Sequence, residues 1–157
     1  MAKKKRTFDL NSGFRVGALV TMLERVMRDE LCKLLVPIDM TYPQFTALMI
    51  LYHAGPISNS ELARLSMMTR QSANEMIKLM ESKGWIARQQ HPENKRIKLI
   101  RITSSGEDAL QFADDAAMTV ENRMLGNRSD KETKRLTQEL ETCLAAMGES
   151  TNPKDKA

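Results

Sequence analysis

The stretch from residue 58 to residue 103 contains two short helical patterns followed directly by two strand-like runs. Apolar side chains recur at helical spacing in residues 58–65 and 69–83, and a brief turn at 66–68 separates the two patterns. Gly84 closes the second pattern, as glycine commonly does just after a helix. Two runs rich in β-branched and long side chains then flank the polar tip HPENKR at 91–96. This order predicts a winged helix-turn-helix.

Further helical patterns lie on both sides of this stretch, each with start and stop residues of the usual type. The expected N-caps are Ser12, Thr41, Ser58, Thr69, Thr103 and Ser129 or Asp130, and the expected stops are Pro37, Gly55-Pro56, Gly84 and Gly126-Asn127. Gln44, three residues after Thr41, would complete a capping box. The chain is therefore expected to be mainly α with a small β-hairpin wing.

The apolar stripes of these helices predict what each one packs against. The expected buried positions are Ala73, Met76, Ile77 and Met80 in one helix and Leu110, Ala113, Ala117, Val120 and Met124 in another. The first helix carries more apolar surface than one neighbour would cover. The last helix has a seam close to coiled-coil spacing, formed by Leu136, Leu140, Cys143, Leu144 and Met147. We therefore expect the first and last helices to meet a second partner.

Charge is unevenly distributed along the chain, whose net charge is +4. Residues 58–102 hold nine basic and four acidic side chains, whereas residues 103–150 hold five basic and ten acidic ones. A basic block of +5 beside an acidic block of −5 indicates a polyanion-binding centre on a scaffold that does not itself touch the polyanion. The basic KKKR near the N-terminus fits a solvated tail and a phosphate-binding arm equally well.

The helix pattern at 69–83 leaves a polar face once its apolar stripe is buried. That face holds Arg70, Gln71, Asn74, Glu75 and Lys78. Arginine can bond guanine, and asparagine or glutamine can bond adenine, while hydroxyls and free N–H groups at a helix start suit phosphates. A merely solvated face is the alternative, and the position between a short helix and a basic hairpin favours DNA.

The hairpin tip is basic and has the size to enter a minor groove, whose negative potential favours an inserted arginine. Lys95 and Arg96 lie at the tip, with Lys98 and Arg101 behind it, and Pro92 stiffens it. The candidate DNA-contacting residues are Ser60, Thr69, Arg70, Gln71, Ser72, Asn74, Lys78, Lys95, Arg96 and Lys98.

With these features the chain resembles the MarR (multiple antibiotic resistance regulator) family of bacterial transcription factors over roughly residues 12–148. The motifs that carry the resemblance are TYPQF, SELA, the KGWI join at 83–86 and ENKR…LIRITSSG. The resemblance implies a homodimer with intertwined terminal helices, a recognition helix in the major groove and a wing in the minor groove. It also implies a repressor, a pseudo-palindromic duplex operator, and release by a small aromatic or anionic ligand.

The chain departs from the family pattern at three positions. Asn94 stands where an acidic residue usually holds the wing arginine, which would leave Arg96 less preorganised. Ser66 stands where many relatives have glycine in the turn. Cys32 lies near the end of the first helix rather than near its start, so peroxide sensing is not supported.

The expected organisation is a single domain between two tails. It comprises a basic tail at 1–10, a MarR-type domain at 11–148 and a flexible tail at 149–157. Within the domain, dimerisation helices span 12–36 and 104–148, and the winged helix-turn-helix spans 41–103, with the helix-turn-helix at about 58–83 and the wing at 85–103.

Several kinds of site are not expected. Cys32 and Cys143 read as buried free thiols, and His53 and His91 have no ligand partner at a usable spacing, so neither a metal nor a cofactor is expected. We find no nucleophile paired with a base and no phosphate-cradling loop, so an enzyme is not expected. With no long apolar run and no secretory signal, the expected location is the cytoplasm, without a membrane partner.

A ligand site is harder to read from the sequence. Arg15, Tyr42, Tyr52 and His53 are candidates for lining one, although each also fits a core-edge or surface position. The alternative function is a winged-helix protein–protein interaction module that uses its basic hairpin on an acidic partner, without sequence-specific DNA binding.

Overall fold

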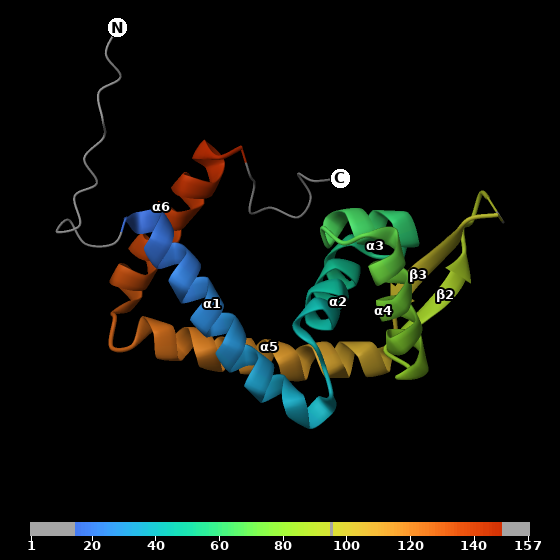
Figure 1. The fold of residues 1–157 in the computed structure, drawn as a ribbon, viewed down its shortest axis with the longest axis horizontal. Helices are drawn as coiled ribbons and strands as arrows, with labels where there is room; N and C mark the ends of the chain where they lie inside the picture. Colours follow the sequence, from blue (N-terminus) through green and yellow to red (C-terminus); the bar gives the residue numbers. More distant parts are fainter. Residues whose placement is uncertain (1–14, 95, 149–157) are drawn as a thin grey trace, which may run out of the picture.

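A computed structural model describes residues 15–94 and 96–148 (Figure 1). Its elements, in chain order, are α1 (Val16–Leu35), the 3-10 helix η1 (Val36–Ile38), α2 (Tyr42–Ala54), β1 (Ile57–Ser58), α3 (Asn59–Leu65), α4 (Arg70–Ser82), β2 (Ile86–Gln90), β3 (Lys98–Ile102), α5 (Ser104–Leu125) and α6 (Asp130–Ala146). The prediction of a mainly helical chain with a small β wing is confirmed.

Helix starts follow from side chains that accept hydrogen bonds from otherwise unpaired backbone N–H groups. The Thr41 hydroxyl accepts from the backbone N of Gln44, whose side chain accepts from the backbone N of Thr41 at 3.0 Å, completing the predicted capping box. Ser58, Thr69, Thr103 and Ser129 cap α3, α4, α5 and α6 in the same way. Four of these caps were predicted from local sequence, and Ser129 was one of two candidates for the fifth.

The first helix begins later than expected. Ser12 lies outside the described residues, and within them α1 begins at Val16, with Arg15 at the N-cap position and no side-chain cap. Pro37 lies in η1, so the α-helix ends at Leu35 and the chain turns into α2 through a short 3-10 segment. The predicted tails at 1–10 and 149–157 also lie outside the described residues.

The sheet has one more strand than the hairpin predicted from sequence. Its order is β1-β3-β2, both pairings are antiparallel, and Ile57 lies opposite Ile100. Strand β3 lies between the other two strands, and on it Ile100 is buried while Leu99 and Ile102 are partly buried. Strand β1 was missed because two residues are too few to show a period of two.

The core joins the helix-turn-helix to the sheet and to the long helices. All four predicted stripe positions of α4 are buried, and the largest fully buried side chains are Leu35, Leu48, Leu51, Leu62, Ile77, Met80 and Ile100. Burying one such side chain stabilises a fold by roughly 1.5–3 kcal/mol. Because the residues of this cluster come from α1 to α5, the orientation of α4 is set by the whole core.

Helix α5 spans the length of the molecule and connects its two ends. In Figure 1 α1 crosses it near the end where α6 lies above it, and the lobe formed by α2, α3, α4 and the sheet lies above and beside its other end. Leu110, Ala113 and Val120 are buried as predicted, and Ala116 is buried as well. The Arg123 Nη1 to Glu30 Oε2 distance of 2.7 Å marks an ion pair between α5 and α1.

The ends of the chain leave much apolar surface uncovered in a single protomer. Helix α6 has no buried residue, and large exposed apolar side chains on α1 and α6 include Val16, Leu19, Val20, Met22, Leu23, Val26, Leu140 and Leu144. Cys32 and Cys143 are also exposed, so the prediction of buried thiols is wrong for the single chain. The physical reason is that these two helices pack on few neighbours within their own protomer.

Among the described helices, none is by itself long and apolar enough to cross a membrane. The segments Val16–Ile38 and Tyr42–Ala54, bent by 84° relative to each other, meet the length and composition criteria only as a pair.

Candidate nucleic-acid interface

Helix α4 presents a polar face away from the core. Its buried positions Ala73, Met76, Ile77 and Met80 follow helical spacing, so the residues between them point outward. Of the predicted contacts on this helix and its cap, Thr69, Arg70, Gln71, Ser72, Asn74 and Lys78 are all exposed, and Ser60 on α3 is exposed as well. The structure thus brings seven of the ten predicted residues onto α3 and α4.

Two hydrogen bonds constrain the amide side chains of this face. The Nδ2 group of Asn59, the first residue of α3, donates to Oδ1 of Asn74. The Nε2 group of Gln71 lies 3.5 Å from Oε1 of Glu75, one helical turn further along α4. Sequence reasoning missed Asn59, because Asn59 and Asn74 are fifteen residues apart and meet only when α3 packs on α4.

The turn between α3 and α4 contains one backbone conformation that L-residues seldom adopt. Met67 has φ 53°, while Ser66 has φ −83°, so the left-handed position of the turn is Met67 rather than Ser66. The Met67 side chain is 89% exposed. The backbone N–H of Met68 donates to the carbonyl of Ala63 at 2.9 Å, which closes the turn and fixes the direction in which α4 departs.

The wing tip is closed by its own backbone and by Asn94. Oδ1 of Asn94 accepts from the backbone N of Arg96 at 3.0 Å, and the carbonyl of Asn94 accepts from the N–H of Ile97 at 2.9 Å. Asparagine thus orders the backbone that leads into Arg96, a turn role for which a short side-chain acceptor suffices. Arg96 and Lys98 are exposed, and Lys95 lies outside the described residues.

An ion pair joins the wing to the last turn of α4. The guanidinium of Arg88 on β2 donates twice to Glu81, at 2.8 Å and 3.0 Å, and this hydrogen bonding raises the pKa of Arg88. A two-point contact between planar groups restricts their relative orientation as well as their distance. Arg88 therefore serves to position the wing relative to α4.

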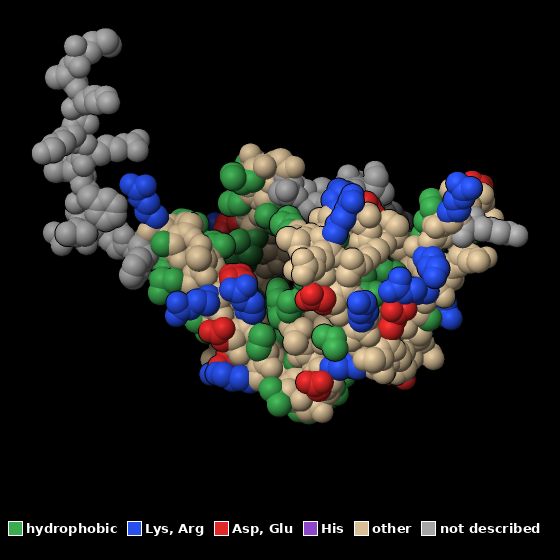
Figure 2. Space-filling view, turned by 45° about the vertical axis from the view of Figure 1, so that its right-hand side comes forward, with side chains coloured by type: hydrophobic (Ala, Val, Ile, Leu, Met, Phe, Trp, Pro, Cys, Tyr) green, Lys and Arg blue, Asp and Glu red, His purple; other side chains and the backbone are tan. Residues whose placement is uncertain are grey.

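A second contact ties the end of α4 to the corner before α2. Nζ of Lys83 lies 2.8 Å from Oδ2 of Asp39 and 4.6 Å from the centroid of the Trp85 ring. Asp39 adopts a left-handed φ of 50°, which aspartate tolerates better than most residues. Basic residues of the 58–102 block thus include Lys83 and Arg88, which contact neighbouring elements of the fold, and others that face outward. Figure 2 shows lysine and arginine side chains over the lobe that holds the wing, at its right-hand side.

Only two of the four predicted ligand-lining residues come together. Tyr52 and His53 lie on one groove, with their rings 5.4 Å apart in an edge arrangement. Tyr42 lines a smaller cleft of about 180 Å³ beside Arg28, whose guanidinium lies 6.0 Å from the Tyr42 ring centroid. Arg15 is exposed at the start of α1 and lines neither.

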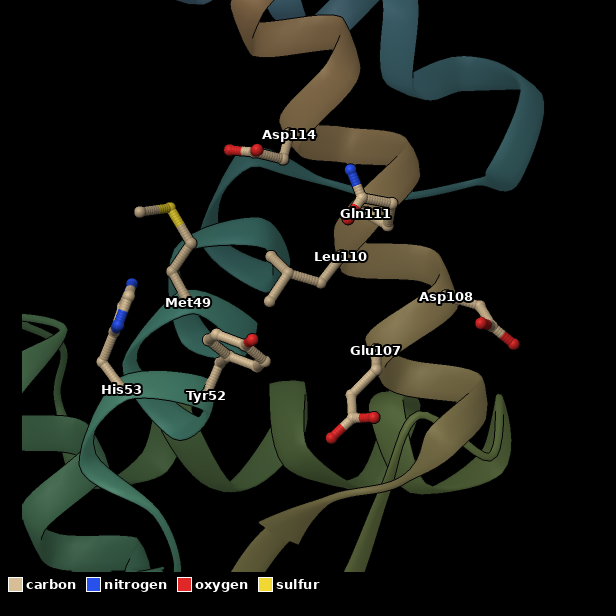
Figure 3. Close-up of a pocket in the computed structure, with 8 residues that line it drawn as sticks. All are labelled: Met49, Tyr52, His53, Glu107, Asp108, Leu110, Gln111 and Asp114. Atoms are coloured by element: carbon tan, nitrogen blue, oxygen red, sulfur yellow. The ribbon is translucent and has the colours of Figure 1, made fainter.

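The groove at Tyr52 has a volume of about 510 Å³ and lies between α2 and α5. Its lining is Met49, Tyr52 and His53 from α2 and Glu107, Asp108, Leu110, Gln111 and Asp114 from α5. In Figure 3, Glu107 and Asp114 lie toward its two ends, around Tyr52 and Leu110, while Asp108 points away from them. The acidic lining was missed because only the packing of α5 on α2 brings it beside the aromatic rings.

Within residues 15–94 and 96–148, no three His, Cys, Asp or Glu side chains are grouped in a way that could hold a metal ion.

Comparisons with known proteins agree on one family. The model of the MarR family matches residues 40–98. The multiple antibiotic resistance protein MarR of Salmonella typhimurium is 32% identical over 103 residues, which cover 65% of this chain and 72% of that protein. An HTH-type transcriptional repressor of Mycobacterium tuberculosis is 27% identical, with 80% of this chain and 92% of that protein covered.

Two further matches concern the share of a relative's length that this chain spans and the similarity of its fold to a solved structure. An uncharacterised HTH-type transcriptional regulator of Bacillus subtilis is 33% identical over 89 residues, and the match spans only 54% of that protein and 57% of this chain. Among solved structures, a mutant MarR of Escherichia coli complexed with operator DNA has a TM-score of 0.68 at 25% identity, covering 82% of this chain and 93% of that one.

Proposed function

Since this chain belongs to the MarR family of helix-turn-helix transcriptional regulators, we propose that it is a homodimeric repressor that binds duplex DNA sequence-specifically. The observation that carries the proposal is the exposed polar and cationic face of α4 beside a basic hairpin. Two relatives support it by name: one is a transcriptional repressor, and one was solved with operator DNA.

In the proposed complex, α4 lies in the major groove and the wing enters the neighbouring minor groove. Arg70, Gln71 and Asn74 face base edges, where each good bidentate contact discriminates by about 1–3 kcal/mol. Thr69, Ser72, Lys78 and Ser60 contact phosphates, helped by the free N–H groups at the start of α4. Lys95, Arg96 and Lys98 supply the charge of the wing, and a narrow minor groove favours such cations.

The dimer rests on the uncovered apolar side chains of α1 and α6. Leaving so many large apolar side chains in water is unfavourable, and a second copy offers the same surface in return. A two-fold symmetric protein then reads a pseudo-palindromic site, with half-sites about 34–36 Å apart or a multiple of that spacing. A DNA partner implies action in the cytoplasm, and no enzymatic activity is proposed.

The salt dependence of binding tests the DNA proposal. The wild type should bind a duplex selected from a random pool with an affinity that falls steeply with salt, since each phosphate contact contributes about 0.9 to the log–log slope. Arg96→Ala should weaken binding to all sequences and reduce the slope by roughly 1–2 for the two wings of a dimer. Filter binding or fluorescence anisotropy at several salt concentrations measures both.

Arg135→Gln, which removes an exposed cation of α6 far from the wing in sequence, is the control and should leave the slope unchanged. A wild type that binds all duplexes equally and without salt dependence would favour the protein–protein interaction module instead.

For regulation, we propose that a small aromatic ligand binds the groove between α2 and α5 and releases the DNA. A ligand acts in this way only if it binds the released form better than the DNA-bound form. The ring of Tyr52 and the side chains of Met49 and Leu110 suit an aromatic body, while Glu107 and Asp114 favour a cation over an anion.

Thermal-shift titrations with an aromatic amine and an aromatic carboxylate of similar size test the ligand proposal. The amine should stabilise the wild type and weaken its DNA complex, whereas the carboxylate should do so less or not at all. Glu107→Gln combined with Asp114→Asn should remove the preference for the amine. Glu121→Gln, which removes an exposed carboxylate of α5 that does not line the groove, should retain it. A stronger response to the carboxylate would contradict this assignment.

A further inference from the structure

Asn59 and Asn74 form a side-chain pair at the junction of α3 and α4. Nδ2 of Asn59 donates to Oδ1 of Asn74, and Asn74 lies on the exposed face of α4. Oδ1 of Asn59 is buried and has no hydrogen-bond partner among the described residues. The carbonyl end of Asn59 therefore faces the protein and its amino end faces Asn74.

The backbone beneath Asn59 is held in place from both sides. Ser58, the preceding residue, pairs with Leu99 in the sheet and also caps α3 by accepting from the backbone N of Glu61 at 3.2 Å. The sheet and the start of α3 therefore fix the position of the Asn59 backbone. Its amide lies with Oδ1 buried and Nδ2 toward Asn74, a residue that we assign to base reading.

We propose that Asn59 determines which base Asn74 reads, an inference that rests on the proposed function. A free asparagine amide offers one acceptor and one donor, the combination that bonds adenine at N6 and N7. The bond from Asn59 turns the carbonyl of Asn74 toward α3, so the amino group of Asn74 is the group oriented toward the major groove. An amino group matches bases with acceptors in the groove: guanine, with N7 and O6, or thymine, with O4.

Gln71 differs from Asn74 in the group that it leaves free. Its Nε2 lies toward Glu75 at 3.5 Å, so its Oε1 remains open as an acceptor for the amino groups of adenine or cytosine. Asn74 therefore offers a donor to the bases and Gln71 offers an acceptor, although the two residue types alone would suggest that both bind adenine.

The test selects duplexes from a random pool with the full-length wild type and with Asn74→Ala, Asn59→Ala and Asn59→Asp. The base pair whose preference disappears in Asn74→Ala is the position that Asn74 reads. At that position the wild type should favour guanine or thymine over adenine by at least about fivefold, near the lower end of the discrimination expected for a good base contact. The positions affected in Gln71→Ala serve as an internal control.

Asn59→Asp replaces the donor by a carboxylate that can only accept, so the amino group of Asn74 turns inward and its carbonyl turns outward. The preferred base should then change to adenine or cytosine. Asn59→Ala frees the Asn74 amide, and adenine should gain relative to the wild type. A base preference is the ratio of two affinities measured with the same variant. If the added negative charge weakens binding to all duplexes equally, this ratio does not change.

Thermal unfolding of each variant checks that it folds. The inference is overturned if both Asn59 variants keep the base preference of the wild type, or if Asn74→Ala changes no preference at all. Either result leaves the proposed function standing, provided that the wild type enriches a specific duplex. A wild type that enriches none overturns the proposed function and this inference together.

Discussion

At the scale of single residues, Gly106 is constrained by close packing rather than by its own backbone conformation. A Cβ atom there would lie 2.0 Å from the carbonyl oxygen of Trp85 and 2.9 Å from Cγ1 of Ile102. The same Trp85 carbonyl accepts from the N–H of Thr103, the residue that caps α5. Any side chain at 106 would therefore push α5 away from the start of β2.

Gly106→Ala should destabilise the protein by about 3 kcal/mol or more, the size of effect expected when a core is overpacked against backbone that cannot move aside. Urea denaturation followed by circular dichroism measures the loss. Ser105→Ala changes an exposed neighbour in the same helical turn and should stay within about 0.5 kcal/mol of the wild type. Equal stability of the two variants would show that the contact is not tight.

The turn residue Met67 shows how residue identity and backbone conformation can conflict. Its φ of 53° lies where L-residues pay a steric cost of roughly 1–2 kcal/mol. The helix-turn-helix forms all the same, because Met68, buried contacts of α3 and the cap at Thr69 fix the chain on both sides. Sequence reasoning placed the turn at residues 66–68, where the structure has it, but did not single out Met67.

At the scale of elements, the wing is joined to α4 by more than the chain that connects them. Glu81 in α4 and Arg88 in β2 form a two-bond ion pair whose side chains are about one-third exposed, at 29% and 37%. A pair this accessible contributes little to stability, on the order of 1 kcal/mol or less. We expect the ion pair to act by fixing the orientation of the wing relative to α4.

Glu81→Gln and Arg88→Gln should each weaken binding to the selected duplex by roughly 3–10-fold, since a wing at the wrong angle no longer reaches the minor groove when α4 occupies the major groove. The double variant should lose little more than either single one, because the same contact is absent in all three. Anisotropy titrations of the four proteins complete the cycle. Effects that simply add would mean that the pair does not position the wing.

At the scale of the whole molecule, the region of α1 and α6 leaves large apolar side chains uncovered. The core cluster draws its residues from α1 to α5, whereas α6 buries none of its seventeen residues and α1 exposes several large apolar side chains. Figure 2 shows hydrophobic side chains at the surface on the left of the view, away from the wing. This distribution is what a protein leaves when a second copy covers that end.

Leu140→Glu combined with Leu144→Glu should convert the proposed dimer into protomers of 17.8 kDa, because two charges would be placed in the proposed apolar contact without partners. Sedimentation equilibrium distinguishes the two masses. The same variant should lose most of its affinity for a two-fold symmetric duplex, since each half-site is then bound separately.

Leu79→Glu is the matched control, because Leu79 is an exposed leucine on α4 rather than on α1 or α6, and it should leave the mass unchanged. A wild type that sediments as a lone protomer would refute the dimer and, with it, the symmetric operator.

Much of this architecture followed from the sequence because it depends on short-range interactions. The caps at Thr41, Ser58, Thr69, Thr103 and Ser129 each involve a side chain and a backbone N–H three residues away. The buried stripe of α4 follows from helical periodicity in the same way. Such signals lie within a few residues of one another, so a single chain displays them without any knowledge of its fold.

The tertiary structure decided what depends on residues far apart in the chain: the β1 strand beside β3, the pairing of Asn59 with Asn74, the acidic groove at Tyr52 and the exposure of both cysteines. Each arises only when separate elements pack, or fail to pack, against each other. Local sequence therefore determined that a reading helix and a wing would form, and long-range packing decided which groups they present, because a side chain's hydrogen-bonding partners are set by its neighbours in space.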